Sequence, residues 1–156
     1  MKEVEIDLHP EVKRLLDLAG ETWEDRDASD AYMKQALSHP MGGIDVLIGA
    51  YRFYFYRHEY EKALDMAASV VEQISKKIKI PDDPALFTKF VVHNKEKKEI
   101  RLYITALMAA AFVNARTGKK EEARLIALLI KSFDEKNEFG ADFLLGVLNG
   151  DYKDED

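Results

Sequence analysis

The sequence predicts an all-α fold, and three observations support this prediction. Apolar residues recur at three- and four-residue steps over most of the chain, which is the period of an amphipathic helix. Polar caps, prolines and glycines separate these stretches at helix-like spacings. One stretch, Phe53 to Tyr56, has high strand propensity, but it lies in a run from 44 to 57 that is too long for a typical strand and does not alternate. We therefore expect about eight helices and no strand.

Four helices are expected in the first half of the chain. Pro10 suits a first helical position, and Gly20 ends that helix. Asp27 is the expected cap of the second helix. The third must be buried on more than one side because aromatic residues surround it. The expected inward residues of the second helix are Ala28, Ala31, Tyr32 and Ala36. The expected ranges are 10–20, 28–37, 44–57 and 59–79.

Four more helices are expected in the second half. Asp83 followed by Pro84 repeats the pattern of a cap and then a proline. Asn94 is the expected cap of a long helix that ends before Gly118, a residue suited to positive φ. The inward stripe of that helix is expected to be Ile100, Tyr103, Ile104, Leu107 and Ala111. The other three expected ranges are 84–92, 121–133 and 138–148.

Length and composition indicate one soluble domain over 1–150, followed by an acidic tail over 151–156. The chain has no Cys, no signal-peptide-like start and no apolar run long enough to span a membrane, so we expect a cytoplasmic protein that does not bind membranes. The net charge is −6, and the one basic segment, 76–101, carries eight basic and four acidic residues. This balance disfavours a nucleic-acid partner.

A helical pair recurs within the chain. An offset of 60 residues places Leu47 over Leu107, His58 over Gly118 and Ala63 over Ala123. With Ala67 over Ala127, these spacings resemble the tetratricopeptide repeat (TPR), in which large residues, a turn Gly and a small Ala follow one another at such intervals. The family repeats at about 34 residues, so a lengthened helix and an insert over 76–98 absorb the difference. Small residues at these positions allow close packing of the two helices in each pair.

The resemblance implies a stack of antiparallel helical hairpins with a concave groove lined by the first helix of each hairpin. Such a groove would hold a peptide or a partner helix, in a non-catalytic interaction scaffold that could act like a chaperone. Two arginines would bind carboxylates of the ligand, and aromatic and Met side chains would supply apolar contact. The groove residues that the resemblance implies are Asp45, Ile48, Arg52, Phe55, Tyr56, Thr105, Met108, Phe112 and Arg116. The alternative is that Phe55 and Phe112 are core and the arginines pair with nearby acids.

The sequence offers no pattern for catalysis. The stretch from His58 to Lys62 lacks the second His that a zinc-protease motif requires, so no metal site is expected. Met41-Gly-Gly43 is not followed by the Lys and Ser or Thr of a phosphate loop. We expect neither a cofactor nor enzyme activity. The runner-up hypothesis is a self-associating helical module, a homodimer in which Phe139, Phe143, Leu144, Val147 and Leu148 pack between copies.

Overall fold

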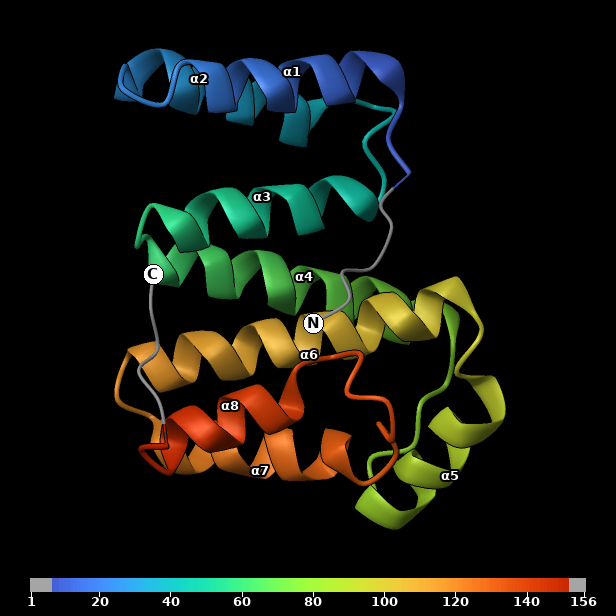
Figure 1. Ribbon diagram of the computed structural model, residues 1–156. Helices are drawn as coiled ribbons and strands as arrows, with labels where there is room; N and C mark the ends of the chain where they lie inside the picture. Colours follow the sequence, from blue (N-terminus) through green and yellow to red (C-terminus); the bar gives the residue numbers. More distant parts are fainter. Residues whose placement is uncertain (1–6, 152–156) are drawn as a thin grey trace. The chain divides into compact units, whose positions relative to one another are not determined.

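The computed structural model describes residues 7–151, and within this range it contains eight α-helices and no strand (Figure 1). The prediction of an all-α fold with eight helices is confirmed for these residues. The helices are α1 (Pro10–Glu21), α2 (Arg26–Ser38), α3 (Asp45–Tyr56), α4 (Tyr60–Lys77), α5 (Pro84–Asn94), α6 (Lys98–Arg116), α7 (Lys120–Lys131) and α8 (Ala141–Leu148). No helix within residues 7–151 combines the length and apolar character needed to cross a membrane.

The chain divides into two compact units, which we call the N-terminal unit (Glu5–Met66) and the C-terminal unit (Ala67–Asp156). Their boundary falls inside α4. The single domain expected over 1–150 stays a prediction. Of the acidic tail expected over 151–156, only Asp151 lies within the described residues.

In the N-terminal unit, α1 and α2 form a helical hairpin that packs on α3 (Figure 1). The two hairpin helices are joined in the interior by Ser29, whose fully buried hydroxyl donates a hydrogen bond of 2.6 Å to the carbonyl oxygen of Ala19. At the contact between α1 and α3, a Cβ atom on Gly49 would lie 2.9 Å from Cδ1 of Leu16. One buried cluster here consists of Val12, Leu15, Ala36 and Val46, with Leu8, Leu16, Tyr32, Leu37 and Leu47 packed against it.

In the C-terminal unit, α6 and α7 form another helical hairpin, and α8 packs on both of its helices (Figure 1). The insert helix α5 contacts α7, where the hydroxyls of Thr88 and Ser132 lie 3.1 Å apart. One buried cluster of this unit draws on α5, α6, α7 and α8. Its members are Phe87, Val91, Ile100, Ile104, Met108, Ala111, Ala123, Ala127, Ile130, Ala141, Leu144 and Leu145.

Buried positions recur in three copies along the chain. Offsets of 34 and then 60 residues relate buried residues of α1, α3 and α6, and the same offsets relate buried residues of α2, α4 and α7. In the first helices these are Val12 and Ala19, Val46 and Phe53, and Ala106 and Val113. In the second helices they are Ser29, Met33 and Ala36, then Ala63, Ala67 and Val70, then Ala123, Ala127 and Ile130. Each of these residues is at most 8% exposed. The three consecutive helical pairs, α1–α2, α3–α4 and α6–α7, therefore share one spacing of buried positions along the sequence, which we call the packing register.

The turn between α3 and α4 and the turn between α6 and α7 have matching backbones. His58 has φ of 62° and Gly118 has φ of 87°, so both adopt the left-handed conformation. In each turn the following amide donates to a carbonyl five residues earlier: Glu59 to Tyr54 at 2.9 Å and Lys119 to Asn114 at 2.8 Å. The prediction that His58 takes the place of a turn glycine is confirmed.

Three local predictions are wrong, two of them in α2. Asp25, and not Asp27, caps α2, because its carboxylate accepts from the amide of Ala28 at 3.2 Å. The buried side of α2 is also different, since Ala31 is exposed while Ser29 and Met33 are buried. Ser29 can face inward because the carbonyl of Ala19 accepts its hydroxyl proton.

The third wrong prediction concerns the cap of α6. The start of α8 also differs from the predicted residue. Asn94 is the last residue of α5 and donates its side-chain amide to the carbonyl of Phe90 at 2.8 Å, so it does not cap α6, which begins at Lys98. α8 begins at Ala141 and not at 138, because the carboxylate of Asp134 accepts from the amides of Glu138 and Phe139. Gly140 follows with φ of 84°, outside the helical region.

The apolar stripe of α8 packs within its own unit. Leu144 is fully buried, and Phe139 and Leu148 pack against the same core. Phe143 is 43% exposed, and Val147 is half-buried. The homodimer contact expected through this stripe stays a prediction, but most of its apolar surface is already used inside the C-terminal unit.

Candidate functional site

The end of α3 and the start of α4 carry four clustered aromatic rings, which we call the aromatic cluster: Tyr51, Phe55, Tyr56 and Tyr60. Phe55 lies at its centre, with ring centroids 5.6 Å from Tyr51 and 5.7 Å from both Tyr56 and Tyr60. Tyr56 is 62% exposed, whereas the other three are half-buried. The cluster follows from sequence because residues four apart on a helix share a face, as Tyr51 and Phe55 do. It offers fixed ring surface to solvent, which suits recognition of apolar side chains.

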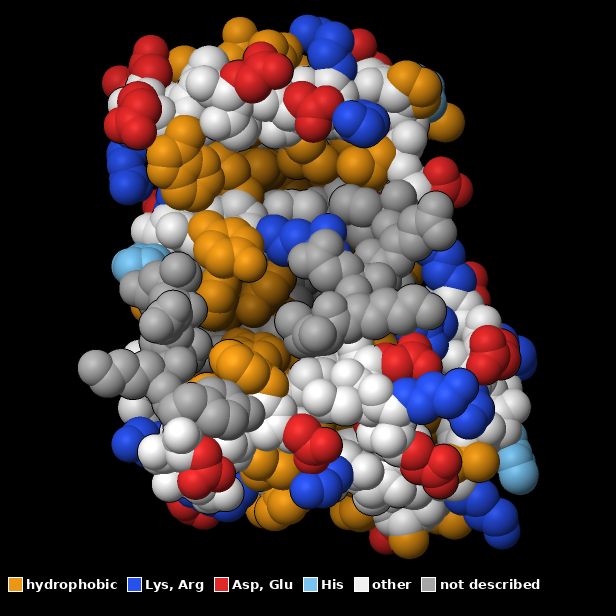
Figure 2. Space-filling model, in the orientation of Figure 1, with side chains coloured by type: hydrophobic (Ala, Val, Ile, Leu, Met, Phe, Trp, Pro, Cys, Tyr) orange, Lys and Arg blue, Asp and Glu red, His pale blue; other side chains and the backbone are white. Residues whose placement is uncertain are grey.

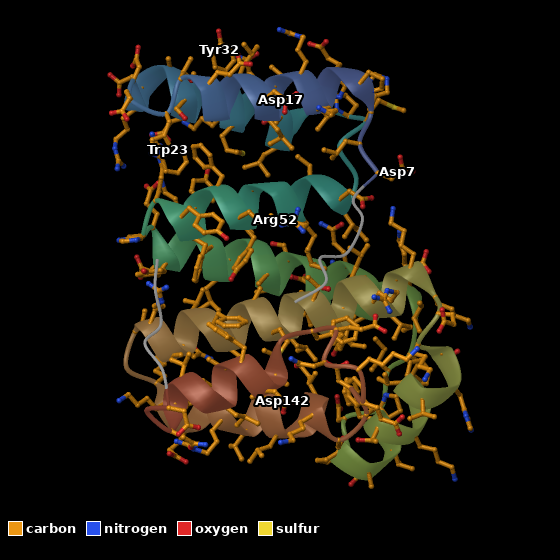
Figure 3. All side chains as sticks on the ribbon, viewed as in Figure 1. Asp7, Asp17, Trp23, Tyr32, Arg52 and Asp142 are labelled. Carbon is orange, nitrogen blue, oxygen red and sulfur yellow. The ribbon has the colours of Figure 1, made fainter. Side chains whose placement is uncertain are left out.

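The α1–α2 hairpin and α3 pack together within the N-terminal unit, and the surface between them is recessed on the face shown in Figure 2. Figure 2 shows hydrophobic side chains along its walls on the face in view. Figure 3 places Trp23 in this space, at the end of the hairpin, and shows Arg52 on α3. Trp23 is 36% exposed, and Arg52 is half-buried. We call this region the α1–α3 hollow; it combines apolar walls with the cationic side chain of Arg52 on α3.

Trp23 is held in position by Arg57, the residue that follows α3. The guanidinium of Arg57 lies 5.0 Å from the ring centroid of Trp23 and 4.8 Å from that of Phe53. It also donates hydrogen bonds to the carboxylate of Asp30 at 2.7 Å and to the carbonyl of Trp23 at 3.1 Å. The rings of Trp23 and Phe53 meet edge to face at 5.3 Å. With only 4% of its side chain exposed, Arg57 fixes one end of the hollow.

The charges near this end are paired. Glu59 lies 3.5 Å from Arg26, 3.3 Å from Lys62 and 4.0 Å from Arg57. Its Oε2 atom is buried without a hydrogen bond, although it lies within ion-pair distance of Arg57. The ammonium of Lys62 sits 5.4 Å from the ring centroid of Tyr54. Burial raises the pKa of Tyr54 above its ordinary value, so this ring stays neutral near pH 7.

The nine groove residues implied by the resemblance fall in both units. Two of them lie in the interior: Ile48 is 2% exposed, and Met108 is 3% exposed. We therefore assign these two to packing. Of the other seven, Tyr56 is exposed and the rest are half-buried. These seven residues are Asp45, Arg52, Phe55, Tyr56, Thr105, Phe112 and Arg116.

The predicted groove residues of each unit have identifiable neighbours. In the N-terminal unit, the carboxylate of Asp45 accepts from the amide of Asp7 at 3.1 Å, and Phe55 is the centre of the aromatic cluster. In the C-terminal unit, Phe112 packs against the core, with its ring 6.3 Å from that of Phe143. The alternative that Phe112 is core therefore has support, whereas Phe55 belongs to a half-exposed cluster.

Sequence reasoning did not single out Trp23, Tyr51, Tyr60 or Arg57 as parts of a site. For Tyr51 the available signal was its spacing of four residues from Phe55. For Trp23 the signal was that it is the one tryptophan of the chain. Its contacts with Phe53 and Arg57 join residues about 30 positions apart in the sequence. A local sequence pattern does not predict a contact over such a separation.

Within residues 7–151, no group of three or more His, Cys, Asp or Glu side chains could hold a metal ion. The imidazole of His58, which begins the stretch compared with a zinc motif, stacks on Tyr60 with ring centroids 5.6 Å apart. The His58 ring therefore extends the aromatic cluster.

No protein-family model matches the chain, and no solved structure matches it. The chain is similar to a protein of Azotobacter chroococcum mcd 1 described as an "Uncharacterized 19.8 kDa protein in nifW 5'region". The two are 32% identical over 108 residues, which cover 67% of this chain and 60% of that protein. The chain thus matches less than two thirds of the relative's length.

Proposed function

We propose that this protein is a non-catalytic interaction module of the TPR-like kind, which holds a peptide segment or partner helix of another protein in the α1–α3 hollow. The observation that carries this proposal is the hollow itself, with hydrophobic walls, a half-exposed tryptophan and an arginine on α3. The aromatic cluster lies at the end of the same helix and adds ring surface there, with Tyr56 62% exposed.

The shared packing register supports the TPR-like part of the proposal. The first two hairpins are offset by 34 residues, which is the period of that repeat, and small residues recur at the first inward position of each second helix: Ser29, Ala63 and Ala123. Repeats of this kind build extended binding surfaces from successive hairpins. The resemblance suggests that the protein acts as a scaffold that binds other proteins. Which ligand it binds depends on the residues of the site.

The chemistry of the hollow defines the class of ligand. Apolar walls and exposed rings favour leucine-like or aromatic side chains, because burial of both surfaces removes apolar area from water. Arg52 already has a contact within the protein, and exchange of that contact for one with the ligand would add a preference for a carboxylate, since a guanidinium binds this group with two parallel hydrogen bonds. The expected ligand is thus an apolar peptide segment that carries at least one acidic group. Binding of such a segment is the chaperone-like part of the proposal.

Selection of peptides from a random library tests this proposal without knowledge of the partner's sequence. Purified full-length protein is used as bait, and the affinities of enriched peptides are then measured by fluorescence anisotropy. We expect enriched peptides to combine apolar and acidic residues. Replacement of Tyr56 by Ala should weaken their binding by about tenfold or more, because aromatic anchors dominate such contacts.

Met41→Ala is the matched control, since Met41 is 59% exposed and Tyr56 is 62% exposed. Met41 lies outside the helices that form the hollow. Equal affinity for the natural protein and the Met41→Ala variant, with weaker binding to Tyr56→Ala, supports the proposal. Absence of enriched peptides, or peptides that bind Tyr56→Ala as tightly as the natural protein, would contradict it.

A further inference from the structure

The charged side chains of α3 lie on one stripe of this helix. Asp45 and Arg52 are the two charged residues of α3, and both are half-buried. They are seven residues apart, so almost two turns bring them to the same side of the helix, about 10 Å from one another along its axis. α3 thus presents a carboxylate near its start and a guanidinium further along the same stripe.

This stripe follows the length of the α1–α3 hollow. The carboxylate of Asp45 accepts from the amide of Asp7 at 3.1 Å. Figure 3 shows Asp7 and Trp23 at opposite ends of the hollow, with Arg52 between them. A segment that lies in the hollow would therefore meet negative charge at one end, positive charge in the middle and ring surface at the other end.

The charged residues of α1, across the hollow from α3, largely pair with one another. Arg14 lies 2.6 Å from Glu11, and Lys13 lies 2.9 Å from Asp17. These pairs are exposed and neutral as pairs, so they add little net charge. Asp7, which is also exposed, adds a second negative charge at the end where its amide meets α3.

Both charged groups of α3 can bind a ligand in addition to the contacts that they already make. Asp45 and Arg52 each have contacts within the protein. An ionised carboxylate accepts several hydrogen bonds, and a guanidinium donates several in a planar fork. An ammonium or a carboxylate on a ligand can therefore share these groups or displace an existing contact.

We propose that the partner segment held in the hollow carries a cationic side chain and an acidic side chain about three residues apart, and then an apolar anchor. The cation pairs with Asp45, the acid pairs with Arg52, and the anchor packs on Trp23. An extended segment advances about 3.3 Å per residue, so three residues match the spacing along α3. This inference rests on the proposed function and specifies its ligand. The order is defined along the hollow, so a segment of either chain direction satisfies it.

The order of charges gives the site specificity, while apolar contact supplies most of the affinity. A segment whose two charges are exchanged would place a carboxylate beside Asp45 and a cation beside Arg52. Like charges that meet at both positions oppose binding, and the anchor on Trp23 prevents the segment from turning round to avoid them. We therefore expect exchange of the two charges to weaken binding by about tenfold or more.

Peptide selection on single variants tests the two charges separately. Peptides enriched on the natural protein should carry the cation and the acid about three residues apart. Selection on Asp45→Asn should lose the preference for the cation, and selection on Arg52→Gln should lose the preference for the acid. Asn retains an acceptor for the amide of Asp7, so Asp45→Asn should fold like the natural chain.

An enriched peptide with its two charges exchanged provides the quantitative test. Fluorescence anisotropy should show about tenfold or more weaker binding to the natural protein than its parent shows, and added salt should reduce this difference. The double variant Asp45→Arg/Arg52→Asp should prefer the exchanged peptide. Circular dichroism checks that each variant is helical, and the single neutral variants decide the test if the double variant does not fold.

Asp27→Asn/Lys34→Gln on α2 is the matched control. These two exposed residues are also an acid and a base seven residues apart, and they lie opposite the buried Ser29. The control should enrich the same peptides as the natural protein. Enriched peptides without the charge order, or preferences unchanged in Asp45→Asn and Arg52→Gln, would overturn this inference and leave the proposed peptide binding intact. Absence of any enriched peptide would overturn both.

Discussion

The guanidinium of Arg57 lies 2.7 Å from the carboxylate of Asp30, although 27 residues separate them in the sequence. This contact connects α2 to the end of α3 inside the N-terminal unit. The side chain of Arg57 is almost fully buried and lies near the rings of both Trp23 and Phe53. The pair therefore holds one end of the α1–α3 hollow in a fixed geometry.

Loss of Arg57 should destabilise the N-terminal unit more than loss of Asp30. Arg57→Ala removes a buried ion pair, a hydrogen bond to the Trp23 carbonyl and two ring contacts, so we expect the free energy of unfolding to fall by about 2–3 kcal/mol. Asp30 is 37% exposed, and solvent weakens its contribution, so Asp30→Ala should cost about 1 kcal/mol. Urea unfolding followed by the fluorescence of Trp23, the only tryptophan, measures both.

The double variant Arg57→Ala/Asp30→Ala isolates the interaction between the two residues. Its destabilisation should be smaller than the sum of the single effects, because each single change already breaks the same contact. Strictly additive effects would show that the two side chains do not interact in solution.

Two glycines form a matched pair, because a Cβ atom at either Gly20 or Gly118 would meet no other atom within 4 Å. Gly20 lies in α1, so Gly20→Ala should raise the free energy of unfolding by about 0.5–1 kcal/mol through lower backbone entropy in the unfolded chain. Gly118 has φ of 87°, so Gly118→Ala should lower it by about 1–2 kcal/mol. Thermal unfolding of both variants checks the opposite signs. A stabilising Gly118→Ala would mean that the left-handed turn between α6 and α7 is absent.

Alkaline pH should destabilise the fold through two tyrosines. Burial raises the pKa of Tyr54 and of Tyr103 above the value of about 10 found in unfolded chains. Above that pH the unfolded chain releases phenolic protons that the folded chain retains, so the free energy of unfolding falls as pH rises. The fall is at most about 1.4 kcal/mol per pH unit for each tyrosine.

Replacement by Phe identifies the groups responsible for this pH dependence. Tyr54→Phe and Tyr103→Phe should each flatten the decline measured by urea unfolding between about pH 9 and 11. Tyr56→Phe is the control, because its side chain is 62% exposed. A decline unchanged by the first two replacements would assign the alkaline sensitivity to other groups.

Most of the fold could be predicted from sequence because prolines, glycines and caps act locally. Pro84 after Asp83 marks the start of α5, and the Asp83 carboxylate accepts from the amide of Leu86 at 3.1 Å as expected of a cap. The length argument correctly assigned the aromatic run of α3 to a helix. The register of 34 residues between the first two hairpins was not recognised, since Ser29 and Met33 do not resemble Ala63 and Ala67 in type.

The candidate site was predictable only in part. Arg52, Phe55 and Tyr56 come from a helix whose position could be inferred from periodicity. Ile48 and Met108 are buried because neighbouring helices pack on several sides of α3 and α6. The periodicity of the sequence does not show how many sides of a helix are buried. The position of Trp23 depends on its contacts with Arg57 and Phe53, which belong to another element of the fold.

Three helical pairs share one packing register, with a small residue at the first fully buried position of each second helix: Ser29, Ala63 and Ala123. The direct measurement is the free energy of unfolding of Ser29→Leu, Ala63→Leu and Ala123→Leu, which place a large side chain at fully buried equivalent positions. The free energy of unfolding of each variant should fall by about 1–3 kcal/mol or more through overpacking. Leucine at the exposed positions, in Ala31→Leu and Ala68→Leu, should change the free energy of unfolding by no more than about 0.5 kcal/mol. Leucine tolerated at any of the three inner positions, or equal losses at the inner and outer positions, would contradict the shared register.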